Sequence, residues 1–402
     1  MTAPSSRRSF LASVGALSAA SLAPAAIRRG LAAQPGDFLF APGLVYLQTG
    51  SLGPTPRSVM DRTIAAWKEL ESNPVLLGYG VQERAMDEVR AQAASFLGCR
   101  TTEIVLTNST TEGMNWAAQG LGLTAGDHVV TTDQEHPGGR VCWDYLVRRA
   151  GVMLDVVPIP LGENDAGAII DRFARAIGPR TRALSFSHLL SSTGLRMPVA
   201  ELSALARSRG CIAIVDGAQA VGGIDVDVTA LGCHVYATSG HKWLLAPKGT
   251  GLLYLSEALG NRVDPIGLQG GRAAYSESSG VGNIPGVIGL GAAIDYLTAI
   301  GKARIEAHNL RLRDRLYQAL RTVPKLRVVS PPAGPLASPL LTYQLPEGIA
   351  SGDLYQRLLD RHRVVVKVVP GHWLNGNRIS THLFNTESDV DALVVALRQE
   401  LA

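Results

Sequence analysis

The segment Thr238–Ser239–Gly240–His241–Lys242–Trp243 stands between two short apolar runs, residues 235–237 and 252–255. Runs of this length are typical of buried strands, and the glycines between them favour a tight turn, so we expect Lys242 to lie in that turn. The serine and histidine beside it carry hydrogen-bonding groups suited to a phosphate, and glycines let backbone amides approach an anion closely. Lys242 is therefore predicted to be a binding-site residue rather than a solvated surface charge.

A second break in the pattern follows the apolar run 211–215, where Asp216–Gly217–Ala218–Gln219 ends a predicted strand. Asp216 is expected at the carboxyl end of that strand, where open α/β sheets bind ligands. A buried carboxylate needs a partner because it loses its hydration. The protonated ring nitrogen of pyridoxal phosphate is one such partner, with Lys242 as the Schiff-base lysine and Gln219 within reach of the ring hydroxyl.

With these residues in view, the chain resembles the class V branch of the fold type I pyridoxal phosphate enzymes, over residues 46–396. The resemblance is strongest to isopenicillin N epimerase and cysteine desulfurase relatives. The motifs that carry it are Thr110–Thr111–Glu112–Gly113, Glu135–His136–Pro137, Asp216–Gly217–Ala218–Gln219, Ser239–Gly240–His241–Lys242 and Arg378–Ile379–Ser380. The resemblance implies pyridoxal 5′-phosphate as cofactor, a small-molecule amino acid or peptide as substrate, and a homodimer.

The region after residues 103–107, a predicted strand, is expected to hold the cofactor phosphate. Ser109, Thr110 and Thr111 supply hydroxyls and unpaired amides at the start of a predicted helix, and such a terminus binds anions. Ordinary capping of the helix by Ser109 or Thr110 is the alternative.

His136 follows the predicted strand 127–132 in a loop at its carboxyl end. The resemblance implies that this histidine stacks on the cofactor ring, whereas a lone histidine is more often structural.

Three residues are predicted to contact the substrate. Arg378 has the planar fork that pairs bidentately with an α-carboxylate, although a surface arginine is the alternative. Ser51 lies in the glycine-proline loop 50–56, which covers the active site in relatives and is otherwise a structural turn. Ser191 stands where desulfurase relatives tend to have an asparagine, so this chain departs from the pattern there.

Another departure falls in the glycine-rich segment 267–291. Relatives carry a Gly-Thr pair there that reaches the phosphate of the neighbouring subunit, whereas this chain has Gly280–Val281. Valine has no hydroxyl, so any such contact is expected from the backbone or from Ser278 or Ser279.

Strand and helix patterns alternate along the chain, which predicts an α/β fold with a doubly wound, mainly parallel sheet. The resemblance makes this a large domain with a seven-stranded sheet and a smaller C-terminal α+β domain. Predicted strands in the smaller domain are 327–329, 340–345, 364–368 and 378–380. The expected organisation is a signal peptide and linker (1–33), a segment over the active site (34–56), the large cofactor-binding domain (57–290) and the small domain (291–402).

The N-terminus carries a twin-arginine pattern, Ser6–Arg7–Arg8–Ser9–Phe10–Leu11, followed by a mildly apolar stretch to Ala26. That stretch contains Pro24 and many small residues, so it makes a poor membrane anchor. Cleavage is expected near Ala23–Pro24–Ala25 or nearer Ala33. We therefore expect the twin-arginine translocase to export the folded protein to the periplasm or beyond.

Composition narrows the classes of function. The 402 residues are 46% hydrophobic and 18% charged, with a net charge of +4 spread along the chain, so no basic tract indicates nucleic-acid binding. No later segment has the apolar length of a membrane span. The four cysteines form no metal-binding pattern and are expected to be buried thiols, with a disulfide after export as the alternative.

The expected chemistry begins with Lys242 as general base and acid at the substrate α-carbon. Epimerisation, transamination, lyase chemistry and decarboxylation share that step. Cysteine desulfurases need a cysteine on a mobile loop to take up sulfur, and in one subgroup of these relatives it lies shortly before the residue that matches Arg378. Residues 364–377 contain no cysteine, so a persulfide-forming desulfurase is disfavoured. A non-catalytic protein that retained the fold is a further alternative, and no Gly-x-Ser-x-Gly or His-Glu-x-x-His motif indicates a hydrolase or metalloprotease.

Overall fold

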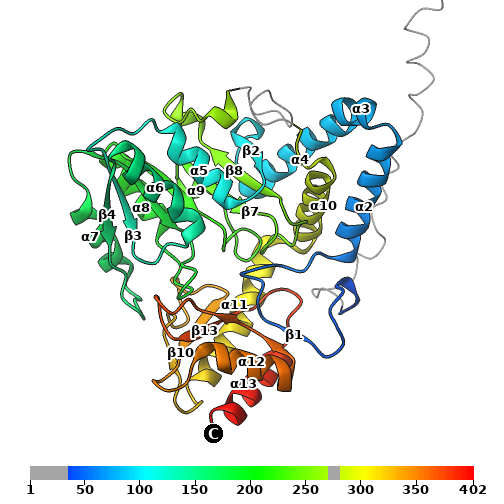
Figure 1. Cartoon of the computed structure of the whole chain (residues 1–402), viewed down its shortest axis with the longest axis vertical. Coiled ribbons are helices and arrows are strands. Elements are labelled where there is room, and N and C mark those ends of the chain that lie inside the picture. Colours follow the sequence, from blue (N-terminus) through cyan, green and yellow to red (C-terminus); the bar gives the residue numbers. More distant parts are fainter. Residues whose placement is uncertain (1–34, 270–280) are drawn as a thin grey trace, which may run out of the picture. The chain divides into compact units, whose positions relative to one another are not determined.

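The computed structural model describes residues 35–269 and 281–402. The predicted signal segment 1–33 and the loop residues Ser278, Ser279 and Gly280 lie outside these ranges. Figure 1 shows the arrangement of the elements. The strands are β1 (Val45–Tyr46), β2 (Ile104–Thr107), β3 (His128–Thr132), β4 (Met153–Val157), β5 (Thr181–Ser187), β6 (Ile212–Asp216), β7 (Val235–Ser239), β8 (Gly251–Leu255), β9 (Arg327–Val328), β10 (Leu340–Gln344), β11 (Val364–Val365), β12 (Lys367–Val368) and β13 (Gly376–Ser380).

Helices occupy most of the remaining described chain. They are α2 (Arg57–Ser72), α3 (Pro74–Leu76), α4 (Gln82–Leu97), α5 (Thr110–Gly120), α6 (Pro137–Ala150), α7 (Ala166–Ala176), α8 (Val199–Ser208), α9 (Val228–Leu231), α10 (Ile284–Ile300), α11 (Lys302–Leu320), α12 (Ser351–His362) and α13 (Glu387–Glu400). Shorter turns are the π-helical η2 (Leu77–Val81) and the 3₁₀ turns η1 (Pro35–Asp37), η3 (Thr101–Glu103), η4 (Glu257–Leu259) and η5 (Ile266–Leu268).

The large sheet has seven strands in the order β2-β8-β7-β6-β5-β3-β4. Strand β8 is antiparallel to both of its neighbours, and the other pairs are parallel, which confirms the predicted fold class. Alternate residues of β6 enter two different apolar cores, Ala213 and Val215 on one face and Ile212 and Ile214 on the other. Burial of both faces explains why these strands are continuous apolar runs rather than alternating ones.

The direction of these strands brings the site together. Strands β2, β3, β5, β6 and β7 run the same way, so their carboxyl ends meet at one edge of the sheet. The segments that leave this edge carry Ser109, His136, Ser191, Asp216 and Lys242. Ligand sites of open α/β sheets form at such an edge.

A smaller antiparallel sheet has the order β12-β13-β10-β9, and a separate parallel pair joins β1 to β11. The prediction of one strand over 364–368 is wrong in this respect. Val366 separates β11, which pairs with β1, from β12, which pairs with β13. Helix α12 packs against β11, β12 and β13, and α13 packs against α11, α12 and β1 (Figure 1); neither helix was predicted from the sequence.

The two sheets have separate apolar cores. Ile288 and Ile294 of α10 belong to a core of the large sheet, whereas Leu312 and Leu316 of α11 belong to the core of the small sheet. The change of core therefore falls along α11.

Within the described ranges, no single helix has both the length and the hydropathy to cross a membrane. The bent pair α10 and α11 passes that test only jointly, with an angle of 76° between the two helices, and α10 is largely buried in the protein core.

Candidate active site

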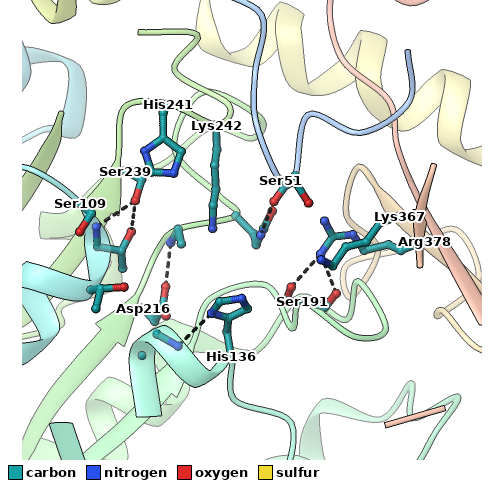
Figure 2. A pocket seen from close by; sticks show the side chains of 17 residues that line it. Ser51, Ser109, His136, Ser191, Asp216, Ser239, His241, Lys242, Lys367 and Arg378 are labelled. Atoms are coloured by element: carbon teal, nitrogen blue, oxygen red, sulfur yellow. Dashed lines mark hydrogen bonds between the residues drawn. The ribbon is translucent and has the colours of Figure 1, made fainter. Parts of the chain in front are cut away.

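A cavity of about 300 Å³ lies between the carboxyl edge of the large sheet and the inner face of the small sheet (Figure 2). Each residue predicted to bind cofactor or substrate lines it. These residues are Ser51, Ser109, Thr110, Thr111, His136, Ser191, Asp216, Gln219, Ser239, His241, Lys242 and Arg378. The cavity therefore joins segments that are far apart in the sequence.

Lys242 and Asp216 face the same space from neighbouring strands. Burial lowers the pKa of Lys242 to about 8, opposed by the attraction of Asp216 and reinforced by Arg378 and Lys367. Burial raises the pKa of Asp216, opposed by Lys242 and by a hydrogen bond from the Ala218 amide. The carboxylate thus needs a cation to remain ionised, and the amine, although still mostly protonated near pH 7, loses its proton far more readily than an exposed lysine does.

The turn that carries Lys242 is held by close backbone contacts. Leu245, fully buried, has φ of 57°, a left-handed conformation that costs a non-glycine residue free energy. The Gly53 amide donates a hydrogen bond to the His241 carbonyl at 2.8 Å, and a side chain at Gly53 would collide with the Lys242 carbonyl. The loop containing Ser51 is thereby fixed against the lysine turn.

His136 caps the N-terminus of α6. Its Nδ1 accepts a hydrogen bond from the Gly138 amide at 3.0 Å, so the proton of the neutral ring lies on Nε2. Burial, with the nearby cations Lys242, Lys367 and Arg378, lowers its pKa to about 4. The ring is therefore uncharged at neutral pH.

The N-terminus of α5 forms one end of the cavity. The Ser109 hydroxyl accepts a hydrogen bond from the Glu112 amide at 3.3 Å, which is the capping role weighed as an alternative. Ser239 accepts a hydrogen bond from the Thr110 amide at 2.9 Å and lies 2.7 Å from the Thr110 hydroxyl. Hydroxyls and a helix N-terminus at one place make a site for an anion.

His241, which directly precedes Lys242, is half-buried and lines the same cavity. Burial, with Lys242 and Lys248 nearby, lowers its pKa to about 4.

Gln219 already has two protein partners. Its amide donates to the Gly50 carbonyl at 2.8 Å and accepts from the Trp243 indole at 2.9 Å. One amide hydrogen remains for a ligand, because the group carries two. Gln219 therefore also ties the loop of Ser51 to the lysine turn.

Arg378 lies on β13 and is fully buried. Its Nη1 donates to the carbonyl and the hydroxyl of Ser191 at 2.8 and 2.7 Å, whereas Nε and Nη2 have no partner within the described residues. Burial lowers its pKa to about 9. Ser191 thus contacts Arg378 directly, and the unpartnered nitrogens remain for an anion.

Comparison with known proteins identifies the family. The Aminotransferase class-V family matches residues 45–393. Isopenicillin N epimerase of Streptomyces clavuligerus is 32% identical over 388 residues, covering 90% of this chain and 96% of the relative. A cysteine desulfurase of Salmonella newport (strain SL254) is 31% identical over 394 residues, covering 88% and 92%. The chain belongs to the class-V aminotransferase family.

The fold is also that of solved relatives. A mutant of C-DES with glycine linked covalently to its pyridoxal phosphate cofactor has a TM-score of 0.81 at 22% identity, covering 89% of this chain and 97% of that one. This member of the class-V aminotransferase family is a pyridoxal 5′-phosphate-dependent enzyme of fold type I. Its cavity fits the cofactor, since it offers an anion site at α5, a buried carboxylate and a buried amine.

Two polar residues near the cavity received no role from the sequence. Glu135 is buried and accepts hydrogen bonds from the hydroxyls of Thr132 and Ser187, both at 2.6 Å. Burial raises its pKa to about 7, with Asp216 adding to the effect. Its place in the Glu-His-Pro motif is the signal that it lies beside the site.

Lys367 is the second residue that was missed. It lies on β12 and lines the cavity beside Arg378. Only the antiparallel pairing of β12 with β13 brings it there.

The four cysteines are free, and none of them lines the cavity. Cys142, Cys211 and Cys233 are buried and Cys99 is partly exposed, as expected for thiols that do not pair. In the part of the chain that the structure describes, no three metal-ligating side chains form a group.

Proposed function

We propose that this enzyme acts at the α-carbon of an amino acid or a peptide-linked amino acid, in the manner of isopenicillin N epimerase. The observation that carries the proposal is the convergence on one cavity of the amine of Lys242, the carboxylate of Asp216 and the guanidinium of Arg378. An amino acid brings the carboxylate that the two unpartnered nitrogens of Arg378 lack.

The residues that would hold the cofactor divide by chemistry. Hydroxyls and amides of the α5 terminus and the lysine turn suit the phosphate, Asp216 suits the ring nitrogen, and the uncharged face of His136 suits the ring. The residues that would surround the phosphate are Ser109, Thr110, Thr111, Ser239 and His241. When bound, pyridoxal phosphate supplies an electron sink for negative charge at the α-carbon.

Lys242 is the residue that would move the proton. A general base works best when its pKa lies near the operating pH, and burial brings this amine to about 8. Arg378 would orient the substrate by a bidentate pair with its carboxylate, and Ser191 holds the guanidinium in place. Ser51 faces the cavity from the opposite loop, where it would exclude water.

The test is product analysis by mass spectrometry after incubation with amino-acid panels in deuterated water. Incorporation of one deuterium at the α-carbon with inversion supports the epimerase proposal. A keto acid formed with a keto-acid acceptor identifies an aminotransferase instead, and lost carbon dioxide or a cleaved side chain identifies an oxidative decarboxylase or lyase that tailors a secreted product. A protein that exchanges no α-proton with any substrate would refute action at the α-carbon.

A persulfide-forming desulfurase is not favoured. That reaction needs a mobile cysteine at the active site, and none of the four cysteines of this chain reaches the cavity. Trapping of a persulfide on the enzyme after turnover with cysteine would contradict this conclusion.

Export rests on the sequence alone. The pair Arg7–Arg8 before an apolar stretch supports recognition by the twin-arginine translocase, and hence a periplasmic or secreted enzyme. Replacing both arginines by lysine should leave the protein in the cytoplasm, as fractionation would measure. Unchanged export of that variant would refute the proposal.

The homodimer is supported by exposed apolar side chains on α2 and α3. Trp67 and Ile64 are 59% and 52% exposed on α2, and Val75 and Leu76 are 71% and 65% exposed on α3. Exposed apolar groups of this size mark interaction surfaces. Analytical ultracentrifugation should give a dimer for the parent and a monomer for Trp67→Glu, and a monomeric parent would refute this proposal.

A further inference from the structure

Two cations stand side by side on the inner face of the small sheet. Lys367 of β12 and Arg378 of β13 are directly opposite in the antiparallel register, so their side chains project from the same face. Both line the cavity, and Figure 2 shows them together at the end away from Ser109.

Neither cation has a counter-ion in residues 35–269 and 281–402. No carboxylate lies within 4.0 Å of either group, and the Lys367 ammonium makes no hydrogen bond with a described residue. Arg378, fully buried, leaves Nε and Nη2 unpartnered. Like charges directly opposite on a sheet destabilise it, so the fold retains this pair at a cost that a ligand would offset.

The ligands already proposed leave one positive charge unmatched. The cofactor phosphate belongs at the α5 terminus, and Asp216 is the carboxylate that lines the cavity, beside Lys242. An α-carboxylate matches the fork of Arg378 bidentately. Lys367, a compact point charge on a flexible stem, remains for another anion.

We propose that Lys367 determines specificity for an amino acid with a second acidic group, which it binds while Arg378 binds the α-carboxylate. The inference rests on the proposed function and names its substrate class, an amino acid whose side chain ends in a carboxylate or a similar anion. Lys367 contacts this group electrostatically and takes no part in proton transfer at the α-carbon.

The first experiment measures binding without chemistry. Glutarate and valerate have the same chain length and differ in one carboxylate, so the cofactor-loaded protein should show a higher melting temperature with glutarate than with valerate. In Lys367→Gln that difference should vanish while the effect of valerate stays. The unliganded variant should melt at the parental temperature or above, because a like-charge contact is removed.

The second experiment compares L-glutamate with L-glutamine, which have similar shape and differ in charge. Parental protein should bind glutamate at least about tenfold more tightly, measured by calorimetry, since a partly buried charge pair is worth more than an exposed one. Lys367→Gln should remove the preference without weakening glutamine, and Lys367→Arg should restore it.

The outcomes separate this inference from the proposed function. Equal weakening of both amino acids in Lys367→Gln would overturn the inference, because Lys367 would then bind the α-carboxylate. An unchanged preference in that variant, or no preference in the parent, would also overturn it. If the stabilisation by glutarate depends on Lys367 but no amino acid exchanges its α-proton, the binding of two acidic groups by Lys367 and Arg378 is supported. The proposed function is then refuted.

Discussion

The two walls of the cavity differ in whether their charged side chains have counter-ions within the protein. On the large-sheet wall, Lys242 faces Asp216, and each shifts the pKa of the other toward the charged form. On the small-sheet wall, Arg378 and Lys367 stand side by side with no described carboxylate within 4.0 Å. The first wall is balanced within the protein, whereas the second is complete only with an anionic ligand.

This difference separates what the family shares from what this enzyme selects. The balanced wall carries four of the five motifs by which the chain resembles its relatives, and we propose that it holds the cofactor. The unbalanced wall contains Lys367, which belongs to none of those motifs. We infer that the cofactor wall determines the chemistry and the other wall determines the substrate.

Removing the amine of the balanced wall should have the largest effect. Lys242→Ala should lower turnover by about a thousandfold or more, because general acid–base catalysis contributes on that order. The variant should also lose the cofactor absorbance that borohydride abolishes in the parent. Turnover and spectra of the purified protein measure both.

Arg175→Ala, at an exposed position on α7, is the control and should retain both properties. Parental turnover in Lys242→Ala would contradict the role assigned to the amine.

Neutralising the acid of the same wall should come next. Asp216→Asn keeps the shape of the side chain but would leave the protonated ring nitrogen of the cofactor without its carboxylate partner. Breaking a buried charge pair costs about 3–5 kcal/mol, and the same loss in the transition state would lower turnover by roughly two to four orders of magnitude. Bound cofactor should be retained, as absorbance would measure. Asp144→Asn on the surface of α6 should be silent, and an equally silent Asp216→Asn would contradict the pairing with the ring nitrogen.

Glu135 lies behind the large-sheet wall, and its role can be tested through the free energy of unfolding. Its pKa is raised from 4.5 to about 7, so the folded state holds the proton more tightly and this group destabilises the fold as pH rises from 4.5 to 7. The unfolding free energy of the parent minus that of Glu135→Gln should therefore fall by about 3 kcal/mol over this interval. Urea titrations across the pH range measure it.

Glu163→Gln is the control of opposite sign. Hydrogen bonds and Arg172 lower the pKa of Glu163, so its stabilising contribution is lost as pH falls. The unfolding free energy of the parent minus that of Glu163→Gln should therefore increase with pH. A flat difference for Glu135→Gln would show that the carboxyl titrates normally.

Ser191, which follows β5 of the large sheet and contacts Arg378 on the small-sheet wall, gives the smallest expected effect. In Ser191→Ala the Ser191 carbonyl still accepts from Arg378, so only one hydrogen bond is lost. A loss of about 1 kcal/mol predicts a roughly fivefold higher KM with kcat unchanged. Ser192→Ala, whose hydroxyl bonds to Gln134 instead, should leave KM unchanged. A fall in kcat for Ser191→Ala would place Ser191 at the reacting atoms.

The sequence by itself determined the large-sheet wall. Apolar runs of strand length end at polar residues, and parallel strands bring those ends to one edge, so the positions of Asp216, Lys242 and His136 follow from local pattern and motif order. The α/β fold follows from the same alternation.

Only the tertiary structure decided the small-sheet wall. Residues 364–368 read as one strand, yet Val366 divides them between two sheets, and only the pairing of β12 with β13 places Lys367 opposite Arg378. Likewise, Ser191 reaches Arg378 across 187 residues. The physical reason is that strand ends are encoded within a few residues, whereas register depends on pairing partners far away in the chain.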